Sequence, residues 1–247
     1  MNLTVVISTF KYRFESLKYL VGKVRQYHST VPIIICVNGE LNQPFDESYR
    51  MNMMHFLADV PFAYPIFQTE FRSLSKLWNE GIVHSATEYV YILNDDVAFE
   101  NSRVFNIIEE EINKGTDMFL APKNSWSHFV VSKKLIDKIG YFDERLLGVG
   151  EEDGYFHWRY EKEFGCRPPE LTFNGVYNKG EYSEFNKEMK VHSTNKSTFN
   201  REFIYGKKYH ASDDGLQGFF DHKVVDFYGT PDYYPAEKFY RQNKKML

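Results

Sequence analysis

The start of the chain alternates between two patterns that together narrow the choice of fold. Residues 3–9 form a β-branched, apolar run that is typical of a buried strand. Apolar residues at helical spacing follow, at Leu17, Leu20, Val21 and Val24. A second apolar run over residues 33–37 ends at Asn38-Gly39, which is a turn signal. Strand, helix and strand in this order predict a βαβ unit with a parallel strand pair, and hence an α/β sheet.

The same alternation continues to about residue 165. The two periodicities predict helices around residues 74–82 and 105–112, and strands over residues 89–93, 118–121 and 129–131. Residues 61–67 are a strand candidate despite their two prolines, whereas the polar, Met-rich residues 40–60 predict no definite element. Later candidates are short, with strands over residues 171–177 and 191–192 and a helix over residues 198–208.

No repeat, low-complexity tract or Pro/Gly/Ser-rich linker divides the sequence. Its 247 residues are enough for one large domain with a substantial core. We therefore expect a single α/β domain over residues 1–208. An aromatic C-terminal extension over residues 209–247 is expected to pack on that domain.

Charge and cysteine content exclude several classes of protein. The net charge of -4 and the pI near 6.1 give no basic surface for gripping a phosphate backbone, so no nucleic-acid partner is expected. Two cysteines are too few for a disulfide framework and lack metal-like spacing. No apolar run reaches the roughly 18–20 residues of a membrane span, and no signal-like segment is recognised. We expect a cytoplasmic protein, with peripheral membrane association left open.

Polar residues follow the predicted strands where ligands of α/β sheets bind. Ser8, Thr9 and Asn38 stand at the carboxyl ends of the first two strands, where a nucleotide can bind. Arg13 follows closely and is placed to meet either phosphates or solvent.

Asn94-Asp95-Asp96 ends the strand predicted over residues 89–93. A carboxylate at a strand end can coordinate Mg²⁺ or Mn²⁺ together with substrate phosphates. The structural alternative is a turn or a helix N-cap, because Asn and Asp commonly form both.

A second acidic pair, Glu152-Asp153, opens a predicted helix after Gly148 and Gly150, which permit a close turn. Acids in a first helical turn stabilise the helix through its dipole, which is the structural interpretation. The functional interpretation is a general base that takes a proton from a hydroxyl. Arg159, on the same predicted helix, is expected to pair with an acid.

Three further residues allow both kinds of interpretation. His192 stands alone in a polar stretch, where a histidine is more often structural or exposed than a ligand. Trp126 and His128 precede a predicted strand, where binding of an acceptor competes with ordinary packing.

Six segments of the chain follow one another in a characteristic order. They are Val5-Val6-Ile7-Ser8-Thr9-Phe10, Ile35-Cys36-Val37-Asn38-Gly39, residues 73–81, Leu93-Asn94-Asp95-Asp96-Val97, Gly140-Tyr141-Phe142-Asp143-Glu144, and Glu152-Asp153 with Arg159. In this order the chain resembles family 2-like glycosyltransferases, from residue 3 to about residue 197. The stretch 148–159 also resembles the Gly-Trp-Gly-Gly-Glu-Asp motif of galactosyltransferases, with Val149 and Glu151 as substitutions.

The resemblance implies a glycosyltransferase A fold, a single Rossmann-like mixed sheet flanked by helices. It implies that a sugar moves with inversion from a nucleotide-diphosphate sugar to a glycan, lipid-linked or protein hydroxyl, in surface polysaccharide or glycoconjugate synthesis. The implied cofactor is Mn²⁺ or Mg²⁺, held by Asp96 and His192, and the implied catalytic acids are Asp153, as the base, and Glu152.

The remaining site residues divide between donor and acceptor. Donor contacts are expected at Ser8, Thr9, Phe10, Arg13, Asn38, Ser73, Asn79, Asn94 and Asp95. Acceptor contacts are expected at Trp126 and His128. The whole assignment requires positions 96, 153 and 192 to converge at one rim of the sheet.

The chain departs from the family's pattern at three acidic positions, where it has Val37, Asn94 and Tyr155. These departures motivate an alternative function, a non-catalytic carbohydrate-binding protein derived from a glycosyltransferase. A sugar-phosphate nucleotidyltransferase is disfavoured because no glycine-rich loop follows the first strand. A transferase acting on a DNA base is disfavoured by the acidic charge balance.

Overall fold

The computed structural model describes residues 2–40, 43–122, 125–144, 146, 149–173, 175–179 and 200. The chain divides into two compact units. The first comprises residues 1–72, 80–135 and 169–182, and the second residues 73–79, 136–168 and 183–247. The predicted strand over 191–192, the extension over 209–247, and the predicted helix over 198–208 apart from Asn200 lie outside the described residues.

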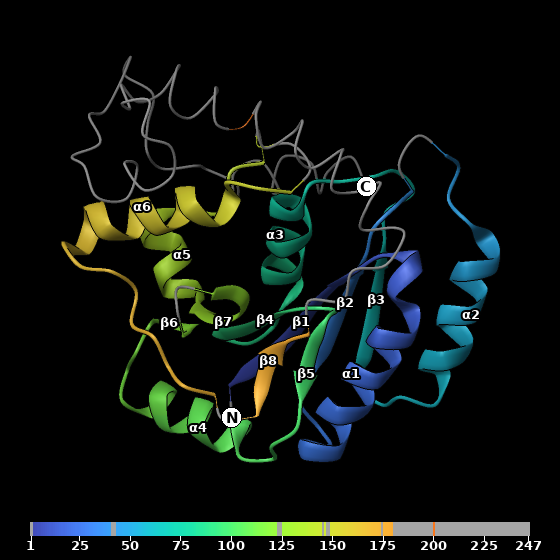
Figure 1. Cartoon of the computed structure of the whole chain (residues 1–247), viewed down its shortest axis with the longest axis horizontal. Helices are drawn as coiled ribbons and strands as arrows, with labels where there is room; N and C mark the ends of the chain where they lie inside the picture. Colours follow the sequence, from blue (N-terminus) through green and yellow to red (C-terminus); the bar gives the residue numbers. More distant parts are fainter. Residues whose placement is uncertain are drawn as a thin grey trace. The chain divides into compact units, whose positions relative to one another are not determined.

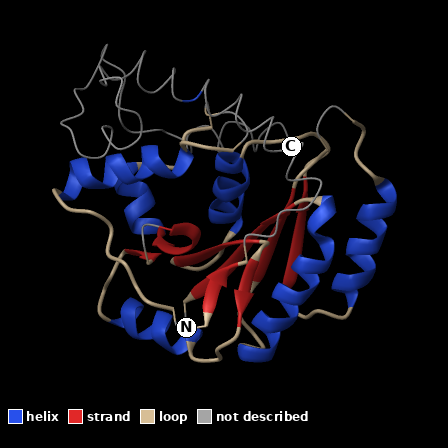
Figure 2. Cartoon of the chain, viewed as in Figure 1, coloured by secondary structure: helices blue, strands red, loops and turns tan. Residues whose placement is uncertain are grey.

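The first unit is built on a six-stranded mixed sheet with the strand order β3-β2-β1-β4-β7-β6. Figure 2 draws the strands in red. The strands are β1 Leu3–Thr9, β2 Ile33–Val37, β3 Ala63–Phe67, β4 Tyr89–Asn94, β6 Met118–Ala121 and β7 Ser125–Ser132. The strands β3, β2, β1 and β4 run parallel to one another. β7 pairs antiparallel with both β4 and β6. The expected α/β sheet flanked by helices is therefore confirmed.

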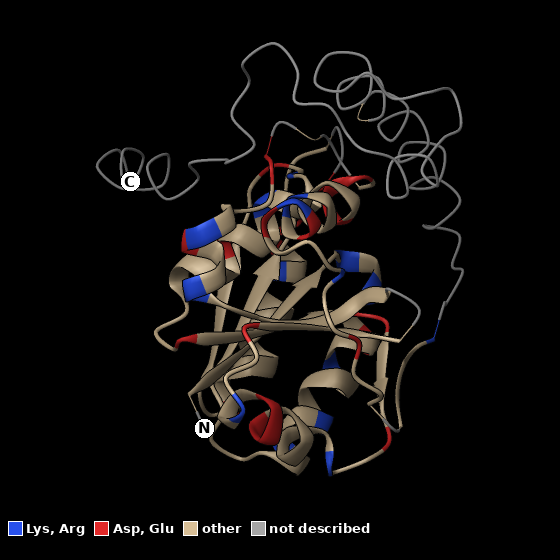
Figure 3. Ribbon diagram, turned by 90° about the vertical axis from the view of Figure 1, so that its left-hand side faces the viewer, with Lys and Arg blue, Asp and Glu red and all other residues tan. Residues whose placement is uncertain are grey.

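The six strands carry no Lys, Arg, Asp or Glu at all, and Figure 3 shows the charged residues on the surrounding helices and loops. Strands covered on both faces are expected to be apolar throughout rather than alternating. β1, with all seven residues buried, is the clearest case. In the sequence, charged residues therefore stand next to these strands only beyond the strand ends.

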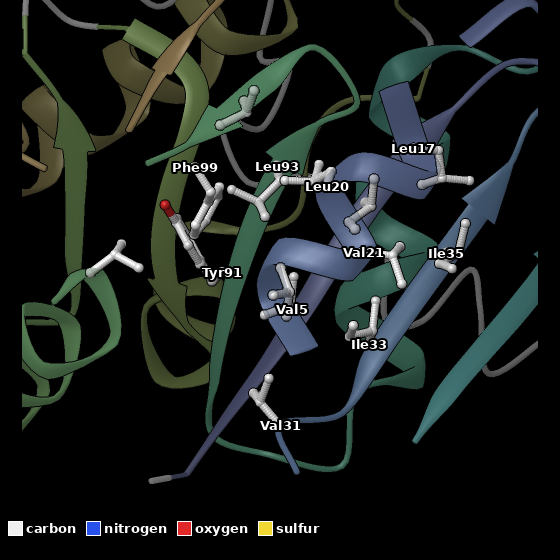
Figure 4. Close-up of a cluster of buried hydrophobic side chains, with 14 of the residues drawn as sticks. Val5, Leu17, Leu20, Val21, Val31, Ile33, Ile35, Tyr91, Leu93 and Phe99 are labelled. Carbon is white, nitrogen blue, oxygen red and sulfur yellow. The ribbon is translucent and has the colours of Figure 1, made fainter. Parts of the chain in front are cut away.

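One face of the sheet is covered by α1 Phe14–Tyr27, α2 Glu47–Ala58 and α4 Val104–Asn113, which bury side chains in one apolar cluster. In the close-up of Figure 4, Leu17, Leu20 and Val21 of α1 lie among side chains from β1, β2 and β4. All four residues predicted at helical spacing in α1 are fully buried. Each such side chain contributes about 1.5–3 kcal/mol by leaving water.

The other face of β1 meets α3 Leu74–His84 at a glycine. Val6 points away from the face that α1 covers, because successive side chains in a strand alternate. A Cβ atom added at Gly81 would lie 2.2 Å from Cγ1 of Val6. The absence of a side chain at position 81 is what allows the helix and the strand to approach so closely.

Several elements differ from the sequence-based expectation. β7 begins at Ser125, so Trp126 and His128 lie within the strand and not before it. Residues 40–60, for which no element was expected, contain α2, whose N-cap Asp46 accepts hydrogen bonds from the amides of Ser48 and Tyr49. Of residues 171–177, expected as one strand, only the end belongs to β8 Val176–Asn178. β8 pairs with the short β5 Val97–Phe99, which the sequence did not predict, in a separate two-stranded sheet.

The second unit contains α6 Glu152–Phe164 and the end of α5 Lys133–Ile139, which lie side by side in Figure 1. Phe142 joins its parts, because its ring stacks on Phe156 at 4.4 Å and meets Trp78 edge to face at 4.8 Å. Within the described part of the chain, no helix has the length and apolar character needed to cross a membrane.

The close approach at Gly81 predicts opposite effects for the same substitution in two helices. Gly81→Ala should lower the free energy of unfolding by about 1–3 kcal/mol, because the added methyl overpacks against Val6. Gly22→Ala in α1 meets nothing within 4 Å and should raise it by about 0.5–1 kcal/mol, through helix propensity alone. Urea denaturation of both variants measures the two signs, and equal stabilisation would contradict the packing described here.

Candidate active site

The carboxyl ends of β1 and β4 meet at the centre of the sheet. Ser8 is in register with Asn94, and the amide of Asn38 donates to the carbonyl of Thr9 over 2.9 Å. The chain leaves β1 toward β2 on one side and reaches β4 on the other, which makes this a topological switch point. Ligands of open α/β sheets bind at such points. The structure thus brings Ser8, Thr9, Asn38 and Asn94 together as predicted.

Asp95 follows β4 directly and is buried. Its Oδ2 accepts a hydrogen bond of 2.9 Å from the Thr9 hydroxyl, and its Oδ1 lies 3.7 Å from Nε of Arg13. Burial raises the pKa of Asp95 to about 7; Arg13 and the Thr9 hydroxyl oppose the shift, and the charge of Asp96 adds to it. The buried carboxylate is thus tied to two residues from the end of β1.

Asp96 lies nearer the surface, and its Oδ2 is 3.3 Å from Nη1 of Arg13. Its backbone carbonyl accepts a hydrogen bond from the amide of Lys179, which follows β8, and this contact fixes the turn after β4. Its Oδ1 is buried and has no hydrogen-bond partner among the described residues. A buried, unsatisfied carboxylate oxygen is costly unless something binds it. Carboxylate oxygens are the ligands that Mg²⁺ and Mn²⁺ prefer, so this one fits a divalent cation.

A complete metal shell is not present in the described part of the chain, where no group of three or more His, Cys, Asp or Glu side chains could hold an ion. His192, the second ligand that the family resemblance implies, lies outside the described residues. Its role stays a prediction.

Asn38 holds the segment that follows β3. Its Nδ2 donates to the carbonyl of Arg72 over 2.9 Å, and its Oδ1 accepts from the amide of Arg72 over 2.8 Å. The neighbouring Gly39 has no room for a side chain, since a Cβ atom there would lie 2.2 Å from the backbone of Glu70. The turn signal Asn-Gly is therefore also a site of close backbone approach.

Asn79 repeats this arrangement in the second unit. Its Nδ2 donates to the carbonyl of Phe142 over 2.7 Å and to Oε1 of Glu144 over 3.0 Å, while its Oδ1 accepts from the amide of Phe142. Ser73 accepts from the amide of Lys76 at the start of α3. These contacts give Asn79 and Ser73 structural roles, and contacts of either with a nucleotide stay predictions.

The second acidic pair lies at the start of α6. Gly150 and Glu151 both have positive φ, of 119° and 73°. A non-glycine residue in this region stores about 1–3 kcal/mol of strain, and such residues cluster at functional sites. Oε2 of Glu152 accepts from the amide of Gly150 over 2.6 Å, which draws the turn tight. The close turn predicted from the glycines is confirmed at Gly150, while Gly148 lies outside the described residues.

The two acids of this pair differ in accessibility. Glu152 is buried, whereas Asp153 is partly exposed and its Oδ1 accepts from the amide of Gly154. Burial raises the pKa of both carboxyls, and for Glu152 the charge of Asp153 adds to the effect. A raised pKa makes a carboxylate a stronger proton acceptor. Asp153 is the one of the two that solvent reaches.

Arg159 anchors α6 through backbone contacts. Its Nη1 and Nη2 donate to the carbonyls of Ile139 and Tyr141, each over 2.6 Å. The guanidinium also lies over the ring of Tyr155, 4.8 Å from its centroid. These contacts bind the segment that follows α5, and the predicted pairing of Arg159 with an acid stays a prediction.

The remaining predicted residues are mostly packed. Trp126 is 8% exposed and meets Phe129 edge to face, and Phe10 stacks on Phe71. His128 is opposite Leu93 of β4 and is buried; its Nδ1 lies 3.0 Å from the Ser127 hydroxyl. Burial lowers the pKa of His128 to about 4. Their predicted contacts with an acceptor are untested.

The ionic contacts of two basic residues were not anticipated from the sequence. Arg13 lies against Asp95 and Asp96 instead of solvent, and Lys11 pairs with Asp46 at 2.6 Å. Both basic residues belong to the 3₁₀ turn Lys11–Arg13 after β1. The sequence signal for these contacts was the position of Lys11 and Arg13 directly after the first predicted strand, whose carboxyl end is where ligands bind.

Solved structures with a similar fold include a mannosyltransferase and a glucosyl-3-phosphoglycerate synthase. The mannosyltransferase PcManGT from Pyrobaculum calidifontis, solved with GDP-Man and Mn²⁺, is similar with a TM-score of 0.62 at 10% identity, over 91% of this chain and 66% of that one. TarS from S. aureus gives 0.57 at 11% identity, over 83% and 42%. Glucosyl-3-phosphoglycerate synthase from Mycobacterium tuberculosis, solved with Mn²⁺, UDP and glucosyl-3-phosphoglycerate, gives 0.56 at 7% identity, over 80% and 79%.

These likenesses establish the glycosyltransferase A fold for this chain. The chain spans a little under two thirds of the mannosyltransferase and less than half of TarS. No protein-family model and no curated protein matches the sequence.

The buried His128 predicts a pH dependence of stability. Its pKa falls from 6.5 to about 4 on folding, so protonation favours the unfolded chain. The free energy of unfolding should therefore drop as the pH falls from about 6.5 to 4, by on the order of 3 kcal/mol from this group. His128→Gln should flatten that slope in urea titrations, whereas His55→Gln, at an exposed position of α2, should not. Equal slopes in His128→Gln and the wild type would contradict the burial of a neutral imidazole.

Proposed function

We propose that the chain is an inverting glycosyltransferase that moves a sugar from a nucleotide-diphosphate sugar to a hydroxyl acceptor. The observation that carries the proposal is the Asp95-Asp96 pair at the switch point between β1 and β4, on a glycosyltransferase A fold. Similar structures were solved with Mn²⁺ and a nucleotide or nucleotide sugar, which supports the same ligands here. The acceptor is a glycan, lipid-linked or protein hydroxyl, in surface polysaccharide or glycoconjugate synthesis.

In this proposal the donor is bound by the first unit. Ser8, Thr9 and Asn94 line the carboxyl ends of the central strands, where the nucleotide binds. Asp96 would hold Mn²⁺ or Mg²⁺ through the oxygen that has no partner among the described residues, with His192 as the further ligand. Such a cation, when bound, stabilises the negative charge that develops on a departing diphosphate. Asp95 orients the site through Thr9 and Arg13.

The acceptor is activated by the second unit. A sugar hydroxyl is too weak an acid to ionise at neutral pH, so it needs a base as it attacks. Asp153 takes this role, because it is the more accessible member of the acidic pair and burial raises its pKa. Glu152 shapes the turn before α6 through its bond to the amide of Gly150. A single displacement with Asp153 as base inverts the anomeric carbon.

Ligand-dependent stability tests the donor and metal part of the proposal. UDP or GDP with Mn²⁺ should raise the melting temperature, since a ligand that binds only the native state stabilises by about 2.7 kcal/mol at 100 times its Kd. Asp96→Asn should abolish the rise, because the amide is a poorer ligand for a hard cation. Asp59→Asn, at an exposed position after α2, is the control of equal charge. A full shift in Asp96→Asn would remove Asp96 from the metal site.

Replacement of the base tests the chemistry. Asp153→Asn should bind nucleotide and Mn²⁺ with an apparent Kd within about twofold of that of the wild type. Its rate of sugar transfer should fall by at least about 100-fold. Glu163→Gln removes one charge from the same helix, at a side chain that pairs with Lys138, and should retain transfer. Release of nucleoside diphosphate from donor sugars is the measurement. Nucleotide binding without any release by the wild type would instead support the carbohydrate-binding alternative.

A further inference from the structure

Arg13, a predicted donor contact, lies against both Asp95 and Asp96 in the structure. We propose that Arg13 is a built-in counter-ion that competes with a divalent cation for Asp96 and transfers to the donor's diphosphate when the cation binds. The inference rests on the proposed function and adds a coupling between metal and nucleotide. Its basis is that one guanidinium contacts both acids, with Nε 3.7 Å from Asp95 and Nη1 3.3 Å from Asp96.

Two adjacent carboxylates in a largely buried position need a positive charge nearby. A buried charge without a partner is strongly destabilising, and the side chains of Asp95 and Asp96 are only 7% and 14% exposed. Arg13, itself 14% exposed, supplies that charge from the end of β1. The chain's own residue therefore offsets part of the negative charge of the site.

The two carboxylates are not held equally. Asp95 also accepts the 2.9 Å hydrogen bond from Thr9, so it remains anchored if the guanidinium leaves. Asp96 has Arg13 on one oxygen, while its other oxygen, Oδ1, has no hydrogen-bond partner among the described residues. Asp96 is the carboxylate that a cation would engage, and a cation there meets the guanidinium at close range. Two positive charges at that distance repel each other, so the cation and the guanidinium each weaken the binding of the other to Asp96.

Arg13 lies outside the sheet, and its two contacts with the acids are long. Its contacts with the acids are longer than the 2.7–2.9 Å of a tight charge-assisted hydrogen bond. Its backbone belongs to the 3₁₀ turn between β1 and α1 and not to either element. A guanidinium presents donors in a fork that matches phosphate oxygens. A diphosphate bound at the carboxyl end of β1 thus offers Arg13 a new anionic partner once Asp96 is taken.

Binding of Mn²⁺ alone and with UDP or GDP tests the inference. Free Mn²⁺ is counted by electron paramagnetic resonance, a readout independent of transfer activity. The wild type should bind Mn²⁺ weakly alone and at least about fivefold more tightly with nucleotide, within the usual range of coupling between sites. Arg13→Gln should bind Mn²⁺ alone at least about fivefold more tightly than the wild type and bind the nucleotide more weakly. Arg50→Gln, at a surface pair with Glu47, should match the wild type.

Two further variants separate competition by charge from a change in folding. Arg13→Met keeps the apolar stem without the charge and should resemble Arg13→Gln, so either variant that melts cooperatively provides the test. Arg13→Lys keeps a positive charge and should keep Mn²⁺ binding weak. Unchanged or weaker Mn²⁺ binding in folded Arg13→Gln or Arg13→Met would overturn the inference while leaving the proposed function intact. Failure of every variant and of the wild type to bind Mn²⁺, even with nucleotide, would overturn both.

Discussion

The exclusion of charge from the central sheet determines where chemistry can occur in this molecule. β1 is buried along its whole length between helices on both faces, and none of the six strands carries an ionisable acid or base other than His128, Cys36 and tyrosines. In the sequence, charged residues stand next to these strands only beyond the strand ends, and at the end of β4 two of them are acids. Burial of these acids is stabilised from the end of the neighbouring strand. Thr9 donates a hydrogen bond to Asp95, and Arg13 brings a positive charge to both acids. The electrostatics of the candidate site therefore depend on the packing of β1 beside β4.

Two asparagines each fix the shape of a loop, Asn38 in the first unit and Asn79 in the second. Asn38 and Asn79 each bind both backbone groups of a sequence-distant residue, Arg72 and Phe142. A side-chain amide that pairs with a backbone amide in this way replaces the hydrogen bonds that an irregular segment lacks. Rigid support of this kind holds the residues of a binding site in place before the ligand arrives. The same two residues lie in segments that resemble glycosyltransferases. Their contacts explain why the residue is asparagine, because its side-chain amide both donates to and accepts from the backbone of the loop that it holds.

Much of the first unit could be predicted from the sequence because its strands are uninterrupted apolar runs. The strands at residues 3–9, 33–37 and 118–121 have the predicted bounds, and the apolar stripe of α1 is buried as expected. α2 escaped prediction because only Tyr49, Met53 and Leu57 are buried, a stripe too narrow to stand out among polar residues and exposed methionines. β5 and β8 are three residues each, which is too short for a periodicity. The pairing of Arg13 with the acids depends on strand order, which no local pattern reveals, and the convergence of positions 96, 153 and 192 stays a prediction.

The central claim is that Asp96 and the ends of β1 and β4 form a site for a divalent cation and a nucleoside diphosphate. Crystals grown with Mn²⁺ and UDP or GDP test it most directly, through an anomalous difference map recorded at the manganese edge. The account predicts a peak within coordination distance of the Asp96 carboxylate, with the diphosphate on the same ion and the Arg13 guanidinium turned from Asp96 toward it. A manganese peak elsewhere on the protein, with Arg13 still lying between Asp95 and Asp96, would contradict it.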